Sequence, residues 1–279
     1  MEKRKITKDT QLCISIAGHP GNFGAIVFNA VFEELSMDFV YKPLRVDSHN
    51  LANAIEGIRA LGIRGSGVSM PHKINVLKYL DIIDPIAMDI GAVNTIVNKN
   101  NILSGYNTDF YGTKKALEEN YDVLGKKVLV IGAGGASRAI IAALKILKAG
   151  EIYISNINEL KAKGLARSLD ISFFSYKHRN DFDGQLLINA TPVGMAPNTK
   201  DIIVEVNTIS KYEAVMDVVV SPFRTMLVEE ASRLGKIIIP GFQMALYQAC
   251  GQFELYTNVP APFQIMKKCV YSLLDQKII

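Results

Sequence analysis

The chain has 279 residues, of which 49% are hydrophobic and 21% are charged, and its formal net charge is +4. This is the composition of an ordinary globular protein, and the length predicts one large or two medium domains. We expect no membrane span, because no apolar run reaches ~18 residues, no secretory signal peptide, and no nucleic-acid partner, because the positive charge forms no basic stripe.

Cysteine and histidine spacing argues against disulfides and metal sites. No Cys-x-x-Cys pair occurs, which fits buried thiols in a reducing cytoplasm, and no two histidines are spaced as metal ligands. The residues concerned are Cys13, Cys250, Cys269, His19, His49, His72 and His178. The basic run MEKRKITK at residues 1–8 is typical of a solvated, frayed terminus.

The first third of the chain alternates strands and helices. Apolar strands are predicted at 12–18, 38–46 and 65–70, with amphipathic helices at 24–37 and 50–62 between them. The segment GVSMPHK ends the third strand and places Lys73 where a helix should begin, although a helix N-terminus favours acidic residues. In open α/β sheets ligands bind at the carboxyl ends of strands, so Lys73 is a candidate functional residue.

A strand–helix–strand unit follows at residues 125–155. The strand KVLVIG leads into the turn GAGGAS, and apolar residues at helical spacing follow until Gly150, where EIYIS begins another strand. Gly132, Gly134 and Gly135 in the turn allow the backbone to approach a pyrophosphate at the helix N-terminus. The unit therefore predicts a dinucleotide-binding Rossmann domain.

Three further apolar strands, at 185–190, 212–220 and 235–241, extend this parallel sheet, with a helix at 224–235. The last helical segment, 242–258, has no strand to pair with and should return to the first domain. We therefore predict an α/β protein in which residues 1–108 and 242–279 form one domain and residues 109–241 form the Rossmann domain.

Polar residues end several elements on what should be one side of the first domain. They are Asn94, Thr95, Asn107, Thr108, Asp109 and Gln248. Lys73 and Asp109 near a nicotinamide would suit ketone reduction, because a lysine can donate the proton that the new alkoxide needs and a carboxylate can orient it. A surface lysine and a helix-capping aspartate would give the same spacing.

Seven segments resemble the shikimate dehydrogenase family, in that family's order and over nearly the whole chain. They are GVSMPHK, GAVNT, NTDFYG, GAGGAS, NATPVGM, DVVVSPFRTML and GFQMALYQA. The resemblance implies an N-terminal substrate domain that the C-terminal helices rejoin, and an enzyme of aromatic amino acid biosynthesis. It implies reduction of 3-dehydroshikimate to shikimate with NADPH, in a cytoplasmic monomer or homodimer whose partner is a small-molecule substrate.

The resemblance also assigns residues. Lys73 becomes the catalytic acid/base and Asp109 its partner. The substrate residues that it implies, counting replacements, are Asn22, Ser69, Asn94 and Gln248. The cofactor residues are Gly132, Gly134, Gly135, Ala136, Asn156, Lys161, Thr191, Val218, Gly241 and Met244. No metal is implied.

The chain departs from the family at both ligands. The serine-x-serine motif that grips the substrate carboxylate is replaced by the shortened GHPGNFG, with Asn22 and Gly24 at the serine positions, and the usual tyrosine is Val220. These changes predict weak shikimate binding that serines at both positions would improve, and point to the shikimate-dehydrogenase-like subgroup. The asparagine-arginine-threonine motif for NADP is SNINELK, so Ile157 replaces the arginine. We therefore predict that NADP is preferred by a reduced margin, with NAD also possible.

Three alternatives remain open on the sequence. A quinate or aminoshikimate dehydrogenase would keep the same catalytic pair. A non-catalytic ligand sensor would not need the pair, and a methylene-tetrahydrofolate dehydrogenase-like enzyme would lack NTDFYG and the C-terminal YQA.

Overall fold

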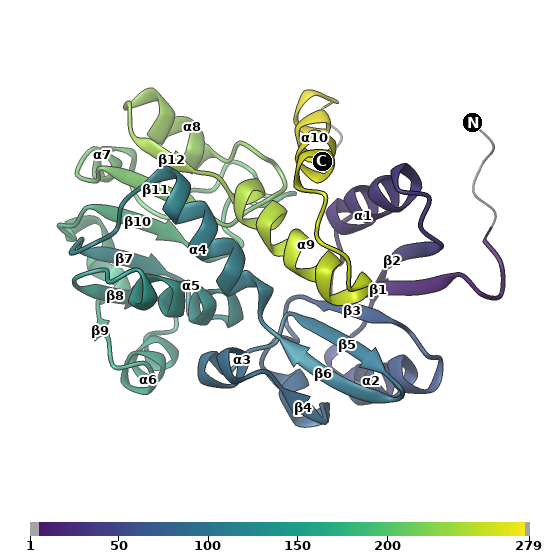
Figure 1. The fold of residues 1–279 in the computed structure, drawn as a ribbon. Helices are drawn as coiled ribbons and strands as arrows, with labels where there is room; N and C mark the ends of the chain where they lie inside the picture. Colours follow the sequence, from purple (N-terminus) through teal and green to yellow (C-terminus); the bar gives the residue numbers. More distant parts are fainter. Residues whose placement is uncertain (1–5, 277–279) are drawn as a thin grey trace. The chain divides into compact units, whose positions relative to one another are not determined.

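The computed structural model describes residues 6–276, with side chains to residue 273, so most of the basic run at 1–8 lies outside the described residues. It divides into two compact units, Met1–Thr108 with Gln248–Ile279, and Asp109–Tyr247. Figure 1 shows the course of the chain through both units. The division after Thr108 coincides with the expected boundary. The division after Tyr247 falls six residues after the expected position, Gly241, and lies inside a helix. No described helix is both long and apolar enough to cross a membrane.

The first unit is built on a six-stranded mixed sheet in the order β2-β1-β3-β5-β6-β4. Its strands are β1 (Gln11–Ala17), β2 (Phe39–Arg45), β3 (Gly65–Val68), β4 (Ile82–Ile83), β5 (Thr95–Lys99) and β6 (Ile102–Tyr106). The three strands predicted from alternation pair in parallel, as βαβ units require. The antiparallel β5–β6 hairpin was not predicted. It turns at Asn100 and Asn101, whose positive φ angles suit a tight hairpin turn.

Helices α1 (Phe23–Glu34), α2 (Leu51–Ala60), α3 (Pro85–Ile90) and α10 (Phe263–Gln276) belong to this unit, with short 3-10 helices at Ser48–Asn50 and Asn75–Tyr79. The helix expected to begin at Lys73 is absent. Lys73 lies in a turn before the 3-10 helix, so the unfavourable placement of an ammonium at an α-helix N-terminus does not arise.

The C-terminal segment does return to the first unit, as the sequence predicted. Helix α10 packs against α1, which Figure 1 shows as yellow beside purple. The ring of Tyr256 lies directly over Gly65, and the Arg64 Nε donates to the Tyr256 carbonyl at 2.7 Å. The sheet of this unit is therefore covered at Gly65 by a residue from the far end of the chain.

The second unit has a six-stranded sheet in the order β12-β11-β10-β7-β8-β9, with every neighbouring pair parallel. Its strands are β7 (Val128–Ile131), β8 (Ile152–Ser155), β9 (Ser172–Phe173), β10 (Leu186–Asn189), β11 (Ala214–Asp217) and β12 (Ile237–Ile239). The order reverses between β7 and β10, the first and fourth strands of the unit. This is the doubly wound Rossmann arrangement.

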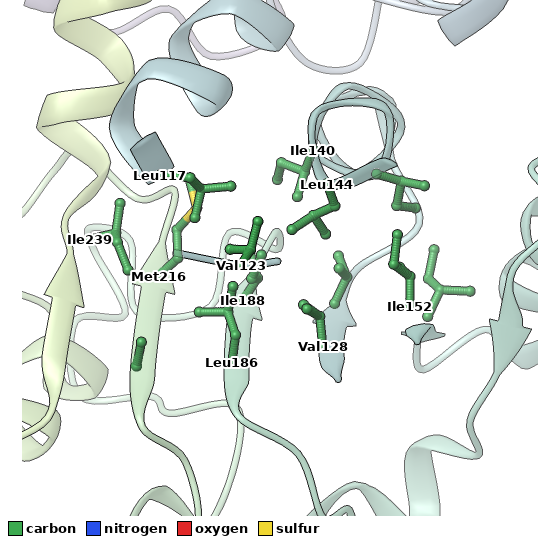
Figure 2. Close-up of a cluster of buried hydrophobic side chains, with 14 of the residues drawn as sticks. Leu117, Val123, Val128, Ile140, Leu144, Ile152, Leu186, Ile188, Met216 and Ile239 are labelled. Carbon is green, nitrogen blue, oxygen red and sulfur yellow. The ribbon is translucent and has the colours of Figure 1, made fainter. Parts of the chain in front are cut away.

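Helices cover this sheet and close its core. They are α4 (Thr108–Asn120), α5 (Gly135–Ile146), α6 (Glu159–Ser168), α7 (Val206–Ile209), α8 (Met226–Arg233), and α9 (Gly241–Thr257), in which the second unit ends. Figure 2 shows Leu117 of α4 and Ile140 and Leu144 of α5 facing strand residues such as Val128 and Ile188. These side chains are fully buried, which explains why the strands are continuous apolar runs.

The strand predicted at 212–220 ends early, at Asp217. Its neighbours β10 and β12 are only four and three residues long, so pairing ends once the Val218 N–H has donated to the Asn189 carbonyl at 3.1 Å. The Val219 N–H instead donates to the Asp217 carboxylate at 3.0 Å. Residues 218–222 are therefore a loop at the carboxyl end of the sheet.

Candidate active site

The segment that carries Lys73 is held by hydrogen bonds at the carboxyl end of β3. The Ser69 N–H donates to the Ile16 carbonyl at 2.9 Å, and the Val93 N–H donates to the Lys73 carbonyl at 2.8 Å. The lysine side chain is half-buried. The backbone of the segment is therefore fixed from both sides at the carboxyl end of β3, the edge of the sheet where ligands bind in this class of fold.

His72, beside the lysine, is a structural residue that sequence reasoning did not single out. It is fully buried, and its Nε2 lies 2.7 Å from the Val46 carbonyl. A carbonyl only accepts, so Nε2 carries a proton and donates it to this bond. The Nδ1 atom has no hydrogen-bond partner among the described residues. The ring therefore ties the Lys73 segment to the end of β2, and spacing gave no signal for this.

Asn94 lies at the centre of a buried polar network in the first unit. Its Oδ1 accepts from the Thr108 N–H at 2.7 Å and from the Thr95 hydroxyl at 2.9 Å, and its Nδ2 donates to Thr108 Oγ1 at 3.0 Å. The Gln252 Nε2 joins by donating to Thr95 Oγ1 at 3.0 Å. Sequence reasoning missed Gln252. The available signal was its spacing of four from Gln248, which puts both on one face of a helix.

Asp109 lies in the first turn of α4 and is 4% exposed. A carboxylate is favourable there because it meets the positive end of the helix dipole. The Thr113 hydroxyl donates to the Asp109 carbonyl at 2.8 Å, which fixes the turn. Asp109 belongs to the second unit and Lys73 to the first, and their pairing stays a prediction.

The shortened loop before α1 leaves Asn22 and Gly24 in different settings. Asn22 is exposed at the helix N-terminus, and its side chain does not cap the helix. A Cβ at Gly24 would lie 3.1 Å from the Tyr41 ring, which is buried and stacks on Phe28 at 4.7 Å between centroids. Burial raises the pKa of Tyr41. A serine at position 24 would therefore crowd a ring that has little room to move.

The remaining predicted substrate residues lie in the first unit. Ser69 is exposed and Gln248 is half-buried, at the point in α9 where the chain enters this unit. Their contacts with a substrate stay predictions.

The glycine-rich turn has the geometry that a pyrophosphate requires. Gly132 has φ +122°, and a Cβ there would lie 2.6 Å from the Ala190 carbonyl oxygen, so only glycine fits without strain. The Gly134 N–H donates to Ser137 Oγ at 3.2 Å, yet a Cβ at Gly134 would meet nothing within 4 Å. Open space therefore lies before the N-terminus of α5, which begins at Gly135 and Ala136. Helix N-termini of this kind bind phosphate groups, and binding of a pyrophosphate at this turn stays a prediction.

The loop after β8 keeps an ordered shape without an arginine. The Asn156 Nδ2 donates to the Asn158 carbonyl at 3.1 Å, and Asn158 Oδ1 caps α6 by accepting from the Lys161 N–H at 3.0 Å. The side chain of Lys161 is exposed, and Ile157 is 80% exposed. Ile157 is therefore an apolar side chain exposed to solvent at the position where the resemblance implies an arginine of the NADP motif.

The other predicted cofactor residues follow β10, β11 and β12. Thr191 and Val218 are half-buried in the loops after the first two strands. Gly241 begins α9, and a Cβ there would lie closer than 3.0 Å to the Val219 carbonyl oxygen. Met244 is 6% exposed and packs in the core of the second unit. No group of three or more His, Cys, Asp or Glu that could hold a metal occurs among the described residues.

Asp217 should make folding stability depend on pH. Burial raises its pKa to about 6, against opposing hydrogen bonds from Thr225, Val219 and Asn189. The folded protein therefore retains a proton that the unfolded chain loses near pH 4, so this group's contribution falls as pH rises from about 4 to about 6. A difference of about two units corresponds to ~3 kcal/mol. In urea unfolding, Asp217→Asn should become more stable relative to the wild type by this order between pH 4.5 and pH 7. A constant difference would contradict the raised pKa.

Comparison with known proteins identifies the family. Residues 23–96 match the shikimate dehydrogenase substrate binding domain, and residues 241–270 match the shikimate 5′-dehydrogenase C-terminal domain. A relative from Methanobrevibacter smithii, named shikimate dehydrogenase (NADP(+)), is 41% identical over 274 residues, which cover 94% of this chain and 97% of the relative. The chain belongs to the shikimate dehydrogenase family.

Solved structures agree with this assignment and with the predicted fold class. A shikimate dehydrogenase in complex with NADP⁺ superposes with a TM-score of 0.88 at 35% identity, covering 97% of this chain and 98% of that one. A shikimate 5-dehydrogenase-like protein superposes with a TM-score of 0.82 at 34% identity, covering 96% and 98%. The resemblance stated from seven sequence segments is confirmed.

Proposed function

We propose that the protein is an NADP-dependent oxidoreductase that interconverts 3-dehydroshikimate and shikimate. The observation that carries the proposal is the combination of the fixed Lys73 segment at the end of β3 with a glycine turn that fits a pyrophosphate. The family relatives named as NADP-dependent support the choice of cofactor. We infer a cytoplasmic enzyme of aromatic amino acid biosynthesis, a monomer or homodimer, in which residues 1–108 and 242–279 bind the substrate.

In this mechanism Lys73 moves the proton. NADPH, when bound, supplies the hydride that reduces a ketone. The Lys73 ammonium donates a proton to the alkoxide oxygen that forms, and in the reverse direction the neutral amine accepts it. Asp109 is the proposed partner that orients the ammonium, because a carboxylate that pairs with a lysine favours one rotamer.

Asn94, Ser69 and Gln248 are proposed to bind the ring hydroxyls. Asn94 suits this role because its network with Thr95 and Thr108 fixes the orientation of its amide. Ser69 offers a hydroxyl at the end of β3, and Asn22 is the side chain left to meet the carboxylate. A polar group that is already oriented loses less entropy on binding.

Shikimate should bind weakly, and steady-state kinetics tests the proposal. Two serines and a tyrosine are replaced, and Asn22 can substitute for one of these three donors. Each hydrogen bond to a charged group contributes about 1.5–3 kcal/mol, so the net loss of two donors corresponds to two to four decades in affinity. We expect measurable NADP-dependent oxidation of shikimate with a high KM. No turnover would contradict the proposed activity. A KM in the low micromolar range would instead show that the remodelled loop binds the carboxylate fully.

The same measurements on quinate and aminoshikimate test the alternative substrates. Crowding of Gly24 by Tyr41 favours a remodelled substrate end, because the usual serine would require the buried Tyr41 ring to shift by a few tenths of an ångström. A kcat/KM for quinate or aminoshikimate above that for shikimate would assign the enzyme to that substrate. Turnover of any of the three would exclude a non-catalytic sensor.

Cofactor preference should be weak, and Ile157→Arg should strengthen it. Arginine binds a phosphate through two parallel hydrogen bonds, whereas Lys161 offers a single flexible charge. We expect the variant to raise the ratio of kcat/KM for NADP to that for NAD by about tenfold. Leu160→Arg, at a position 81% exposed in the same region, is the matched control for added charge. Equal effects of both variants would refute a specific role for position 157, and a wild type that prefers NAD would overturn the preference.

A further inference from the structure

Asp217 is a buried acid that the proposed mechanism does not use. It ends β11, is 0% exposed, and accepts hydrogen bonds from three segments of the second unit. Its Oδ1 accepts from Asn189 Nδ2 and from the Val219 N–H, both at 3.0 Å, and its Oδ2 accepts from the Thr225 hydroxyl at 2.6 Å. A carboxyl group in the interior is costly unless it is hydrogen-bonded, and here every bond fixes a different piece of chain.

The bond to Asn189 controls the loop after β10. Asn189 Oδ1 accepts from the Thr191 N–H at 3.0 Å and from the Thr191 hydroxyl at 2.6 Å. Its Nδ2 also donates to the Val193 carbonyl at 3.1 Å. The Asp217 carboxylate can only accept at physiological pH, so together with the Val193 carbonyl and the Thr191 N–H it fixes which end of the Asn189 amide faces Thr191. Without Asp217 the amide loses that constraint.

The other two bonds control the loop after β11. The bond from the Val219 N–H turns the chain out of the sheet directly after Val218. The Thr225 hydroxyl donates to Asp217 and accepts from the Val228 N–H at 3.3 Å, and thereby caps α8. Both ends of the 218–225 loop are therefore attached to the same carboxylate.

The two loops lie on one side of the point where the strand order reverses. That point is between β7 and β10, and a dinucleotide spans it, with one half on each side. The loop after β8, which carries Asn156, and the first turn of α6, which carries Lys161, lie on the adenosine side. The loops after β10 and β11 therefore serve the nicotinamide half.

We propose that Asp217 is a positioning residue that holds Thr191 and Val218 in place for the nicotinamide half of NADP. The proposal rests on the proposed function, in which these two residues contact the cofactor. Asp217 itself is buried beneath the loops and acts through Asn189, Val219 and Thr225. It is required for the shape of the cofactor site and does not touch the reacting atoms.

Binding measured by calorimetry on the full chain separates this role from general stability. Asp217→Ala should raise the Kd for NADP by about ten- to a hundredfold. It should leave the Kd for 2′,5′-ADP, which lacks the nicotinamide half, within about twofold of the wild type. Asp217→Asn keeps an acceptor for Asn189 and Val219, so it should recover most of the NADP affinity.

Thr225→Val decides the case if Asp217→Ala does not fold, because it keeps the Asp217 carboxylate and removes only the hydroxyl that bonds to Asp217 and to the Val228 N–H. We expect a severalfold weaker affinity for NADP. Thr208→Val is the matched control, since Thr208 is 3% exposed and its hydroxyl donates to Asn180, and neither residue belongs to either loop. A folded Asp217→Ala or Thr225→Val with wild-type NADP affinity would overturn the proposal, as would an equal loss for 2′,5′-ADP. A wild type that does not bind NADP would instead overturn the proposed function.

Discussion

Lys73→Ala should lower kcat by about 10²–10⁴-fold, the usual contribution of a general acid/base. The Kd for NADP should stay near the wild-type value, because the glycine turn around Gly132 is in the other unit and keeps its contacts. Steady-state kinetics and calorimetry on the purified variant measure both quantities.

Two further variants define what the lysine supplies. Lys73→Arg should not restore kcat, because a guanidinium does not give up its proton near neutral pH. Lys78→Ala removes an exposed lysine five residues later and should leave kcat unchanged. A Lys73→Ala enzyme with near-wild-type kcat would exclude the catalytic role.

Gly65→Ala should lower the free energy of unfolding by about 3 kcal/mol, at the upper end of the usual range for overpacking. A Cβ at this position would lie closer than 3.0 Å to the ring of Tyr256, and that ring is fully buried, so it has no space into which to retreat. Denaturant unfolding of wild type and variant measures the difference.

Gly57→Ala provides the matched control in the same unit. Gly57 lies inside α2, and a Cβ there would meet nothing within 4 Å. Alanine should therefore stabilise the protein by about 0.5–1 kcal/mol through its better helix propensity. If Gly65→Ala were as stable as the wild type, the close packing of Tyr256 on β3 would be wrong.

The parts of the fold that the sequence predicted are those with strong local patterns. The β7–α5–β8 unit combines β-branched runs, a glycine turn and helical spacing, so its elements agree closely with the structure. The β5–β6 hairpin was missed because Asn100-Asn101 is a weaker turn signal than Asn-Gly. The α-helix expected to begin at Lys73 is absent. Pro71 and the edge of the sheet, rather than helix propensity, determine the conformation of that segment.

The residues of the candidate site likewise fall into those that the sequence predicted and those that it missed. Lys73 and Asp109 stood out because their segments resemble a family, and chemistry gave each a role. His72, Gln252 and Asp217 did not, because their importance lies in hydrogen bonds to residues that are distant in the sequence. No periodicity records that His72 reaches the Val46 carbonyl or that Asp217 connects two loops.

The return of the C-terminal segment to the first unit has a consequence for the order in which the protein is made. Residues 109–247 form a continuous stretch that is complete before Tyr256 leaves the ribosome, and domains generally fold as units during synthesis. The first 108 residues, in contrast, emerge early and must wait with the surface around Gly65 uncovered. During translation the nascent N-terminal sheet is therefore the part that needs protection from aggregation, and chaperones should bind it rather than the Rossmann unit.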